Sequence, residues 1–567
     1  MKRPIWILSL LLVVCSHPCF AKAPFSNDYA GMAVVTEDGR GAVASVNSIA
    51  SQVGLEAFAN GGNAVDAAAA IAFTLGVVDS ANSGIGGGCF ILVRWADGSI
   101  EAIDGREMAP VNATQEMFLV DGEYDPSLSK TGALAIGVPG SVAALDYLLK
   151  KGGKLSWKEA VLPAVNIAEQ GFSLGSHDAK RLARTASRLN QFPASAAIFL
   201  DKDAQAWGAG HVLKQPDLAR TYQLLADHGS DYFYRGDFAK QVASWMRVNG
   251  GRVTEKDFAG YQVLLREPIR TTFHGYDIVG FPPPSSGGVA VAQILNILEN
   301  FPLKQLTEID RYHTTIEAMK LAFADRAQWL GDADFANVPK GLIEKSYAKA
   351  LANKIDAAKA TQVKGHSTPP KSTTDIFNRH TTHIAVADRE GNWVAITTTL
   401  NTSYGSKVTI PGTGVLMNNQ MDDFATKEGV PNAFGLIGYS ANKVEARKRP
   451  LSSMSPTLVL KKGKPVLTTG AAGGPTIITQ VVQILVNRLA LDNSLLKSME
   501  VPRVHQQWQP ERTLIDPSVD ESLRKGLDAR GHQLADWPGF GTAQSIALEN
   551  GRFVAVSEPR LKDRMSE

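Results

Sequence analysis

Thr381-Thr382-His383-Ile384-Ala385-Val386-Ala387-Asp388, followed by Arg389-Glu390-Gly391-Asn392 and residues 393–399, is the stretch on which the rest of the chain depends. Two runs rich in apolar and β-branched residues flank a short polar turn with a glycine, which predicts a β-hairpin. Residues 354–380 before it are polar, rich in Lys, Ser, Thr and Pro. We expect this tail to be flexible, because it offers too little apolar surface to bury.

A strand that begins at a threonine directly after such a tail is what a chain cut between His380 and Thr381 is expected to look like. The cut would give Thr381 a free α-amine beside its own hydroxyl, which is a nucleophile and its base in one residue. Threonine is also common in ordinary strands. On this stretch alone the ordinary strand is the favoured interpretation.

The chain has 567 residues, of which 44% are hydrophobic and 20% charged, so it can bury a large core. Lys2 and Arg3 precede an apolar run over residues 5–15, and Cys19-Phe20-Ala21 ends in a small residue. This pattern predicts a secretory signal peptide over residues 1–21, too short to span a membrane. We therefore expect a periplasmic or secreted bacterial protein that has no membrane span once the signal is removed.

Removing the signal peptide lowers the Lys+Arg count from 58 to 56, against 56 for Asp+Glu. A chain without net charge gives no reason to expect a nucleic acid or an anionic membrane as partner. Cys89 alone stays in the mature chain, and its place at the start of an apolar strand favours a buried structural thiol over a nucleophile. No Cys/His cluster has metal-ligand spacing, so we predict neither a metal nor a cofactor.

Elsewhere strands and helices alternate without the regular spacing of a doubly wound sheet. The glycines of residues 84–88 precede a strand and no Gly-Lys-Ser/Thr follows them, which argues against a phosphate-binding loop. A second hairpin is predicted over residues 543–556, around Asn550-Gly551. Further strands are predicted over residues 89–94, 99–104, 276–281 and 458–460, and helices over residues 48–60, 64–78, 140–150, 157–169, 213–228, 238–248, 289–298, 312–330 and 477–489.

Several short motifs surround the central hairpin in a fixed order. They are Arg106-Glu107-Met108-Ala109-Pro110 upstream, then Leu400-Asn401-Thr402, Asn418-Asn419-Gln420-Met421-Asp422-Asp423-Phe424, Pro450-Leu451-Ser452-Ser453-Met454-Ser455-Pro456-Thr457 and the Gly473-Gly474 turn. With these motifs, over about residues 31–559, the chain resembles the gamma-glutamyltransferase (gamma-glutamyl transpeptidase) family. The resemblance reverses the preference for an ordinary strand at Thr381.

The resemblance implies an N-terminal-nucleophile hydrolase fold, an α+β fold in which two stacked sheets lie between helical layers (a four-layer αββα sandwich). It also implies autocatalytic cleavage at His380–Thr381. The products would be a large subunit, residues 22–380, and a small catalytic subunit, residues 381–567, which form a heterodimer. The implied substrates are γ-glutamyl small molecules such as glutathione, with water, an amino acid or a dipeptide as acceptor.

The resemblance also assigns roles to single residues. Thr381 would attack the γ-glutamyl amide, and the hydroxyl of Thr399 would hydrogen-bond the nucleophile. Gly473 and Gly474 would offer backbone N–H groups to the oxyanion, a role that suits glycine because no Cβ obstructs close approach. His383 lies two residues along the strand and is expected to be structural.

The amino-acid head of the substrate needs a partner for each of its two charges. Arg106 would form a bidentate pair with the α-carboxylate and Asp423 would pair with the α-ammonium, from opposite sides of the pocket. Further polar contacts are implied for Ser452, Ser453, Asn401 and Gln420.

Two features depart from the family pattern. Many bacterial members carry a tyrosine in the cover loop, here residues 429–435, whose hydroxyl binds the pocket asparagine, whereas this chain has Phe434. We expect the cover to shield the acyl-enzyme less firmly and to shift the balance towards hydrolysis. The basic pair Arg379-His380 precedes the cut and is expected to affect its rate, not its position.

Two alternatives stay open. One is an acylase of the same fold that acts on glutaryl or cephalosporin side chains, against which Asp423 argues, because such a side chain has no need of a partner for an α-ammonium. The other is a secreted protein that never matures and binds amino acids or peptides.

Overall fold

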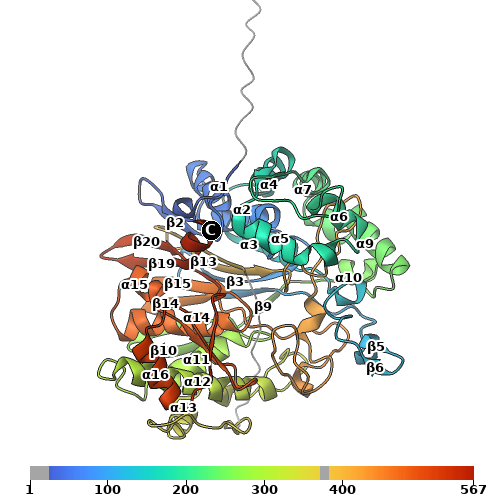
Figure 1. The fold of residues 1–567 in the computed structure, drawn as a ribbon. Coiled ribbons are helices and arrows are strands. Elements are labelled where there is room, and N and C mark those ends of the chain that lie inside the picture. Colours follow the sequence, from blue (N-terminus) through green and yellow to red (C-terminus); the bar gives the residue numbers. More distant parts are fainter. Residues whose placement is uncertain (1–24, 371–381, 567) are drawn as a thin grey trace, which may run out of the picture.

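The computed structural model describes residues 25–370 and 382–566, so the expected signal peptide, His380 and Thr381 lie outside the described residues. Within these ranges two antiparallel sheets stack on one another (Figure 1). The first has the order β1 (Ala33–Val35), β2 (Gly41–Ala44), β12 (Thr382–Asp388), β13 (Trp393–Thr399), β3 (Gly88–Arg94), β4 (Ile100–Gly105) and β9 (Leu264–Arg266). The second has the order β10 (Ile269–Phe273), β11 (Tyr276–Gly280), β14 (Thr457–Lys461), β15 (Lys464–Ala472), β19 (Thr542–Glu549) and β20 (Arg552–Ser557).

The alternation of large and small residues in β12 explains how the layers stack. Ile384 and Val386 lie in a core shared with α1 (Ser48–Ala59) and α2 (Ala64–Val78). Ala385 and Ala387 point the other way, into the core between the two sheets. Because successive side chains of a strand face opposite ways, one strand supports both interfaces, and its alanines let the sheets approach closely.

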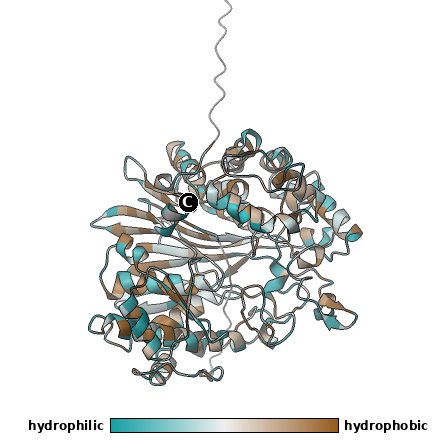
Figure 2. Ribbon diagram, viewed as in Figure 1, coloured by the Kyte–Doolittle hydropathy of each residue, from teal (hydrophilic) through white to brown (hydrophobic). Residues whose placement is uncertain are grey.

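Helices cover the outer face of each sheet, which gives the layer order helix, sheet, sheet, helix (Figure 1). The second sheet packs against α11 (Gly287–Leu298), α12 (Glu308–Trp329) and α14 (Thr476–Leu485). Figure 2 shows hydrophobic residues along the strands and mixed hydropathy on the outer helices. The other longer helices are α3 (Ser141–Gly152), α4 (Trp157–Gln170), α5 (Ser176–Leu189), α7 (Pro216–His228), α9 (Asp237–Val248), α13 (Lys345–Ala352), α16 (Glu521–Ala529) and α17 (Arg560–Ser566).

The predicted central hairpin is confirmed, with Thr382 opposite Thr398. Its turn is held by Asp388, whose carboxylate accepts hydrogen bonds from the backbone and side-chain amides of Asn392, both at 2.9 Å, and from the backbone N–H of Ala64 at 3.0 Å. The hairpin is thereby fixed to the first turn of α2. Because the two strands are antiparallel, the start of β12 and the end of β13 lie together at the open end of the hairpin, opposite this turn.

Most predicted helices and strands are present, with ends shifted by a few residues. The predicted helix over residues 477–489 is α14 followed by a π-helical turn, Val486–Ala490, and the predicted helix over 213–228 begins only at Pro216. Residues 212–213 instead form β8, which pairs with β7 (Phe172–Ser173). Several elements were not predicted, among them helix α5 and strand β15.

The part of the polar tail that the structure describes, residues 354–370, is irregular but bound to α12. The backbone N–H groups of Thr361 and Ser367 donate to Glu317 and Asp325, and the carbonyl of Asp356 accepts from His313. Backbone hydrogen bonds order this stretch with little apolar burial, since only Ile355 and Val363 pack against the core of the second sheet and Pro369 is buried, which is why its composition suggested a flexible segment. None of the described helices is long and apolar enough to cross a membrane.

Candidate active site

The glycine turn lies where β15 ends and α14 begins, beside the start of β12. Gly473 and Gly474 have φ values of 128° and 60°, which other residues adopt with strain. Within the described part of the chain, neither backbone N–H donates a hydrogen bond. Two adjacent free N–H groups near a helix N-terminus can stabilise an oxyanion.

Arg106 follows β4 and is fully buried. Its Nη2 lies 2.7 Å from Oδ2 of Asp423, its Nη1 lies 3.3 Å from Oε2 of Glu107, and its Nε donates to the carbonyl of Pro450 at 3.2 Å. Arg106 and Asp423 therefore contact one another, whereas the sequence suggested that they face each other across a pocket. The reason is that each buried charge takes the other as its partner.

Four further predicted residues lie on segments that adjoin this pair: Gln420 is in the same 3-10 turn as Asp423, Ser452 and Ser453 follow Pro450, and the side chain of Asn401 donates to the carbonyl of Asn419 at 3.0 Å. Most of them hold polar atoms without a partner. Oδ1 of Asn401, both amide atoms of Gln420 and Oγ of Ser453 are buried and make no hydrogen bond within the described part of the chain. Ser452 is engaged, because its Oγ accepts from the backbone N–H of Met454 at 3.4 Å. Buried polar groups are normally hydrogen-bonded, so a cluster of unpaired ones marks a site for a polar ligand.

The cover loop lies over this cluster. The side chain of Asn432 donates to Oδ1 of Asp423 at 3.4 Å, and the backbone N–H of Ala433 donates to Asp422 at 2.9 Å. The ring of Phe434 packs on Gly474 so tightly that a Cβ there would lie 2.8 Å from it. The glycine turn and the cover loop therefore fit together only because position 474 has no side chain.

The two ends of the hairpin differ in what the structure describes. Thr381 lies outside the described residues, but its neighbour Thr382 is buried. Thr399, at the end of β13, accepts a hydrogen bond from the backbone N–H of Asn401 at 2.7 Å.

His383 is fully buried against Thr397, and burial lowers its pKa to about 3, which fits the expected structural role. Burial likewise raises the pKa of the Cys89 thiol, in line with a structural cysteine.

Two charged residues of the site were missed by the sequence analysis. Burial raises the pKa of Glu107 to about 7, and the neighbouring Arg106 opposes that rise. Arg326 of α12 is also fully buried, with Nε 3.1 Å from Oγ of Ser286. Burial lowers its pKa to about 10, while Asp423 acts in the opposite direction. Glu107 stands in the quoted Arg106 motif, but no local pattern distinguishes Arg326 from other helix residues.

One group of residues could hold a metal ion by distance alone. Ligand atoms of His313, Glu317 and His532 lie within 4.8 Å of one another. They already have partners: His313 and His532 form a 2.7 Å hydrogen bond, and Lys320 lies 2.8 Å from Glu317. These contacts account for the cluster without an ion, and the absence of a metal stays a prediction.

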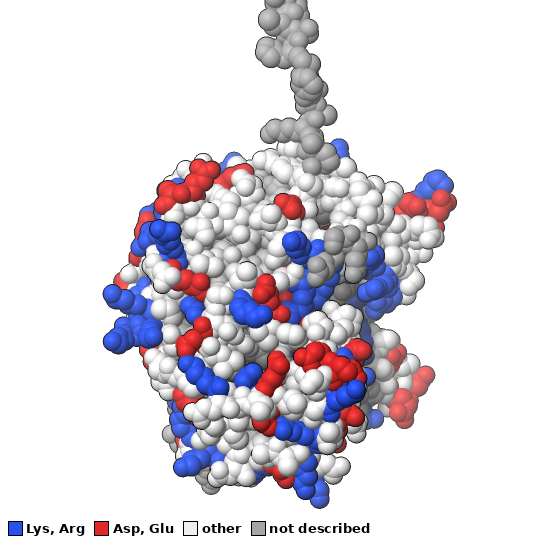
Figure 3. All heavy atoms as spheres, turned by 60° about the vertical axis from the view of Figure 1, so that its left-hand side comes forward, with Lys and Arg blue, Asp and Glu red and all other residues white. Residues whose placement is uncertain are grey.

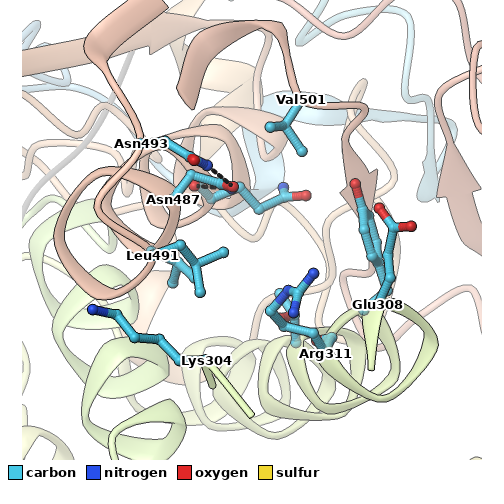
Figure 4. Close-up of a pocket in the computed structure, with 11 residues that line it drawn as sticks. Lys304, Glu308, Arg311, Asn487, Leu491, Asn493 and Val501 are labelled. Atoms are coloured by element: carbon cyan, nitrogen blue, oxygen red, sulfur yellow. Dashed lines mark hydrogen bonds between the residues drawn. The ribbon is translucent and has the colours of Figure 1, made fainter. Parts of the chain in front are cut away.

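Two of the larger cavities in the described part of the molecule differ in how they relate to the predicted site residues. One, of about 580 Å³, lies between α12 and the π-helical turn (Figure 4) and is lined by none of the predicted site residues. The other, of about 900 Å³, is lined by Thr382, Ser403 and Gly473, so it opens beside the glycine turn. The second cavity is therefore the one connected with the candidate site.

Comparison with known proteins agrees with this geometry. A sequence profile of the gamma-glutamyltranspeptidase family matches residues 50–567. The glutathione hydrolase proenzyme of Escherichia coli is 42% identical over 93% of this chain and 91% of its own length. The cephalosporin acylase of Bacillus halodurans superposes with a TM-score of 0.83 at 27% identity, covering 97% of this chain and 98% of that one. The gamma-glutamyltranspeptidase of Helicobacter pylori gives a TM-score of 0.55 at 39% identity, covering 56% of this chain and 92% of that one.

These likenesses define an α+β protein of the class that contains gamma-glutamyltranspeptidases and cephalosporin acylases. The chain belongs to the gamma-glutamyltranspeptidase family.

The buried ion pair makes a testable contribution to stability. Replacing Asp423 by Leu leaves the charge of Arg106 buried with a weaker partner, so we expect the free energy of unfolding to fall by about 3 kcal/mol. The matched control is the double variant Arg106→Met/Asp423→Leu, which removes both charges and should regain most of the loss. Guanidinium denaturation at pH 6, followed by circular dichroism, measures the free energy of unfolding of both variants. A double variant no more stable than the single one would contradict the argument.

Proposed function

We propose that the protein is a gamma-glutamyltransferase and glutathione hydrolase that matures by cutting its own chain between His380 and Thr381. The observation that carries the proposal is the buried Arg106–Asp423 pair with unpaired polar atoms on the adjoining segments, which the cover loop connects to the free N–H groups of the Gly473-Gly474 turn. The resulting chains are a large subunit, residues 22–380, and a small subunit, residues 381–567. The signal-like N-terminus supports a periplasmic or secreted bacterial location.

The proposed reaction begins with the hydroxyl of Thr381, whose proton passes to the residue's own α-amine as the oxygen attacks the γ-carbonyl carbon. The negative charge then formed on the carbonyl oxygen is stabilised by the N–H groups of Gly473 and Gly474, and Thr399 orients the nucleophile. Collapse of the intermediate breaks the C–N bond, and the leaving amine takes the proton. Water, or the amine of an acceptor, then attacks the γ-glutamyl ester and restores the hydroxyl.

Binding of the substrate's head requires an exchange of partners within the buried pair. The α-carboxylate takes the place of Asp423 on the guanidinium of Arg106, and the α-ammonium takes the place of Arg106 on Asp423. Both protein charges stay neutralised during the exchange, so the pocket favours a ligand that brings both charges. Asn401, Gln420, Ser452 and Ser453 then supply hydrogen bonds to the head.

An acylase for glutaryl or cephalosporin side chains is the second candidate, because the superposed Bacillus halodurans protein is described as a cephalosporin acylase. A glutaryl group has no α-ammonium, so it would take Arg106 from Asp423 and offer that carboxylate nothing in exchange. Comparing rates on γ-glutamyl-p-nitroanilide and glutaryl-p-nitroanilide separates the two functions. Faster release of p-nitroaniline from the glutaryl compound would favour the acylase.

Maturation is the first test. Purified protein is expected to give two chains on a denaturing gel, with the shorter one beginning Thr-Thr-His-Ile by N-terminal sequencing. Thr381→Ala removes the hydroxyl and should leave one chain without activity, whereas Thr381→Ser keeps a hydroxyl and should still be cut. An intact wild-type chain without activity would favour the non-maturing peptide-binding protein. An intact chain that hydrolyses γ-glutamyl-p-nitroanilide, or a cut elsewhere, would contradict the mechanism and indicate another enzyme.

The cover loop gives a second test. Phe434→Tyr adds a hydroxyl that can donate to the unpaired Oδ1 of Asn401. We expect the ratio of transfer to hydrolysis to rise about two- to fivefold, since a hydrogen bond of about 0.5–1 kcal/mol keeps the cover closed against water. Transfer to glycylglycine and release of glutamate are measured in one assay. The control, Phe434→Leu, should not raise the ratio, and an unchanged ratio in Phe434→Tyr would show that the cover does not set this balance.

The raised pKa of Glu107 leads to a prediction of how substrate binding depends on pH. Because the pKa of Glu107 is raised to about 7, its carboxyl is neutral below that pH and charged above it. The charged form competes with the substrate's α-carboxylate for Arg106, so KM should rise about three- to tenfold between pH 6 and pH 8.

Steady-state kinetics of wild type and Glu107→Gln over this pH range test the idea. The variant stays neutral and should show a nearly flat KM. Glu101→Gln, at a surface contact with Lys151, is the matched control and should keep the wild-type profile. If wild type and Glu107→Gln give the same KM profile, another group controls the pH dependence.

A further inference from the structure

The cavity of about 900 Å³ beside the glycine turn continues away from the buried pair. Thr382, Ser403 and Gly473 line one part of it, and helix α5 lines another. Neither Arg106 nor Asp423 lines this cavity. If the γ-glutamyl head occupies the buried pair, the group on the nitrogen side of the scissile amide extends into this second space, which falls within the ~300–1,000 Å³ range of ligand pockets.

Helix α5 brings a row of arginines to the cavity. Arg184 and Arg188 follow Arg181 by three and seven residues, a spacing that places all three on one face of a helix. All three line the cavity, as do Lys180 and Arg564, against two carboxylates, those of Asp79 and Asp178. The balance of charge in the cavity is therefore positive, although basic and acidic side chains are interspersed over the molecular face in Figure 3.

These cationic side chains differ in whether they already have partners within the protein. Arg181 donates to Nε2 of His177 at 2.7 Å and lies 3.7 Å from Asp79. Arg564 donates to the carbonyls of Pro538 and Phe540. Arg184 and Arg188 are exposed and form neither an ion pair nor a hydrogen bond from their side chains within the described part of the chain.

The positive charges of these side chains affect the pKa of a neighbouring histidine, His177. Burial lowers the pKa of His177 to about 4, and Arg181, Arg564, Arg184 and Lys180 all add to the effect. His177 therefore stays neutral at the pH of ordinary assays and adds no charge of its own. The groups that an anionic ligand would meet here are the arginines.

We propose that Arg184 and Arg188 form a subsite for carboxylates on the nitrogen side of the scissile amide, so that acidic peptides are preferred as leaving groups and acceptors. The inference rests on the proposed function, because it places the γ-glutamyl head at Arg106 and Asp423. Four helical residues correspond to roughly 6 Å along the axis. Residues i and i+2 of an extended peptide are ~7 Å apart on the same side. An acidic residue at alternate positions of the peptide therefore matches the spacing of the two arginines.

The test compares two γ-glutamyl donors that differ only in charge, γ-Glu-Glu-Gly-Glu and γ-Glu-Gln-Gly-Gln. For wild type we expect kcat/KM for release of the first glutamate to be about tenfold higher with the acidic donor, from two partly screened ion pairs. The double variant Arg184→Gln/Arg188→Gln should lose this preference but keep the wild-type rate on γ-glutamyl-p-nitroanilide. In wild type the preference should also fall about threefold or more when sodium chloride is raised to ~0.5 M, because salt screens exposed pairs.

A matched control removes two arginines elsewhere. Arg220 and Arg247 are exposed on α7 and α9 and do not line the cavity. The variant Arg220→Gln/Arg247→Gln has the same net charge as the test variant and should keep the wild-type preference. A control that loses the preference equally would overturn the subsite, since the effect would then come from overall charge.

Direct binding separates this inference from the proposed function. Fluorescence anisotropy of dye-labelled Glu-Gly-Glu is expected to show about tenfold weaker binding to Arg184→Gln/Arg188→Gln than to wild type. Equal binding by both proteins, together with equal turnover of the two donors by wild type, overturns the subsite. A wild type that binds the labelled peptide through the two arginines but releases no glutamate from any donor supports the subsite and overturns the proposed function.

Discussion

The full burial of Arg106 is the constraint that organises the site. A guanidinium without water must be neutralised and hydrogen-bonded, since an unpaired buried charge costs several kcal/mol. Glu107, the next residue along the chain, meets this requirement together with two distant segments, which supply the carboxylate of Asp423 and the carbonyl of Pro450. Each brings its own surroundings with it. The segment of Asp423 carries Gln420 and is bonded to the cover loop through Asn432, and Pro450 leads directly into Ser452 and Ser453.

Elements with a strong local pattern could be predicted from the sequence. The alternation in β12 and the uninterrupted apolar run of α2 each give a periodic signal, and both elements lie where expected. Helix α5 was missed because few of its residues are buried: Leu182, Thr185 and Leu189. The end of β15 was read as part of a turn, because glycine and alanine have low β propensity. Pairing with β19 overrides that propensity, and Gly470 is needed there, since a Cβ would lie 2.4 Å from the ring of His383.

The site itself was predicted as a set of residues, not as an arrangement. The motifs supplied Asn401, Gln420 and Ser453, and the structure gathers them as buried groups with unpaired polar atoms. The contact between Arg106 and Asp423 has no signal in the sequence, because the two residues are 317 positions apart. The same holds for Arg326, whose helix also packs against the second sheet. Such contacts follow from how the layers stack, which local sequence patterns do not encode.

The Arg106–Asp423 pair and the cavity beside α5 differ in whether their charges are already paired. This difference explains how each place could discriminate between ligands. In the proposed pocket for the amino-acid head, Arg106 and Asp423 already neutralise one another, so a ligand with one charge would gain one ion pair and break another. A carboxylate alone would take Arg106 and leave Asp423 buried without its closest partner, whereas a zwitterion replaces both halves of the pair at once. In the cavity beside α5, Arg184 and Arg188 have no protein partner to lose among the described residues. An anion bound there gains attraction without breaking a contact, but exposure and salt keep that gain small. The buried pair can therefore decide whether a substrate is accepted, while the cavity beside α5 adjusts the preference among accepted substrates.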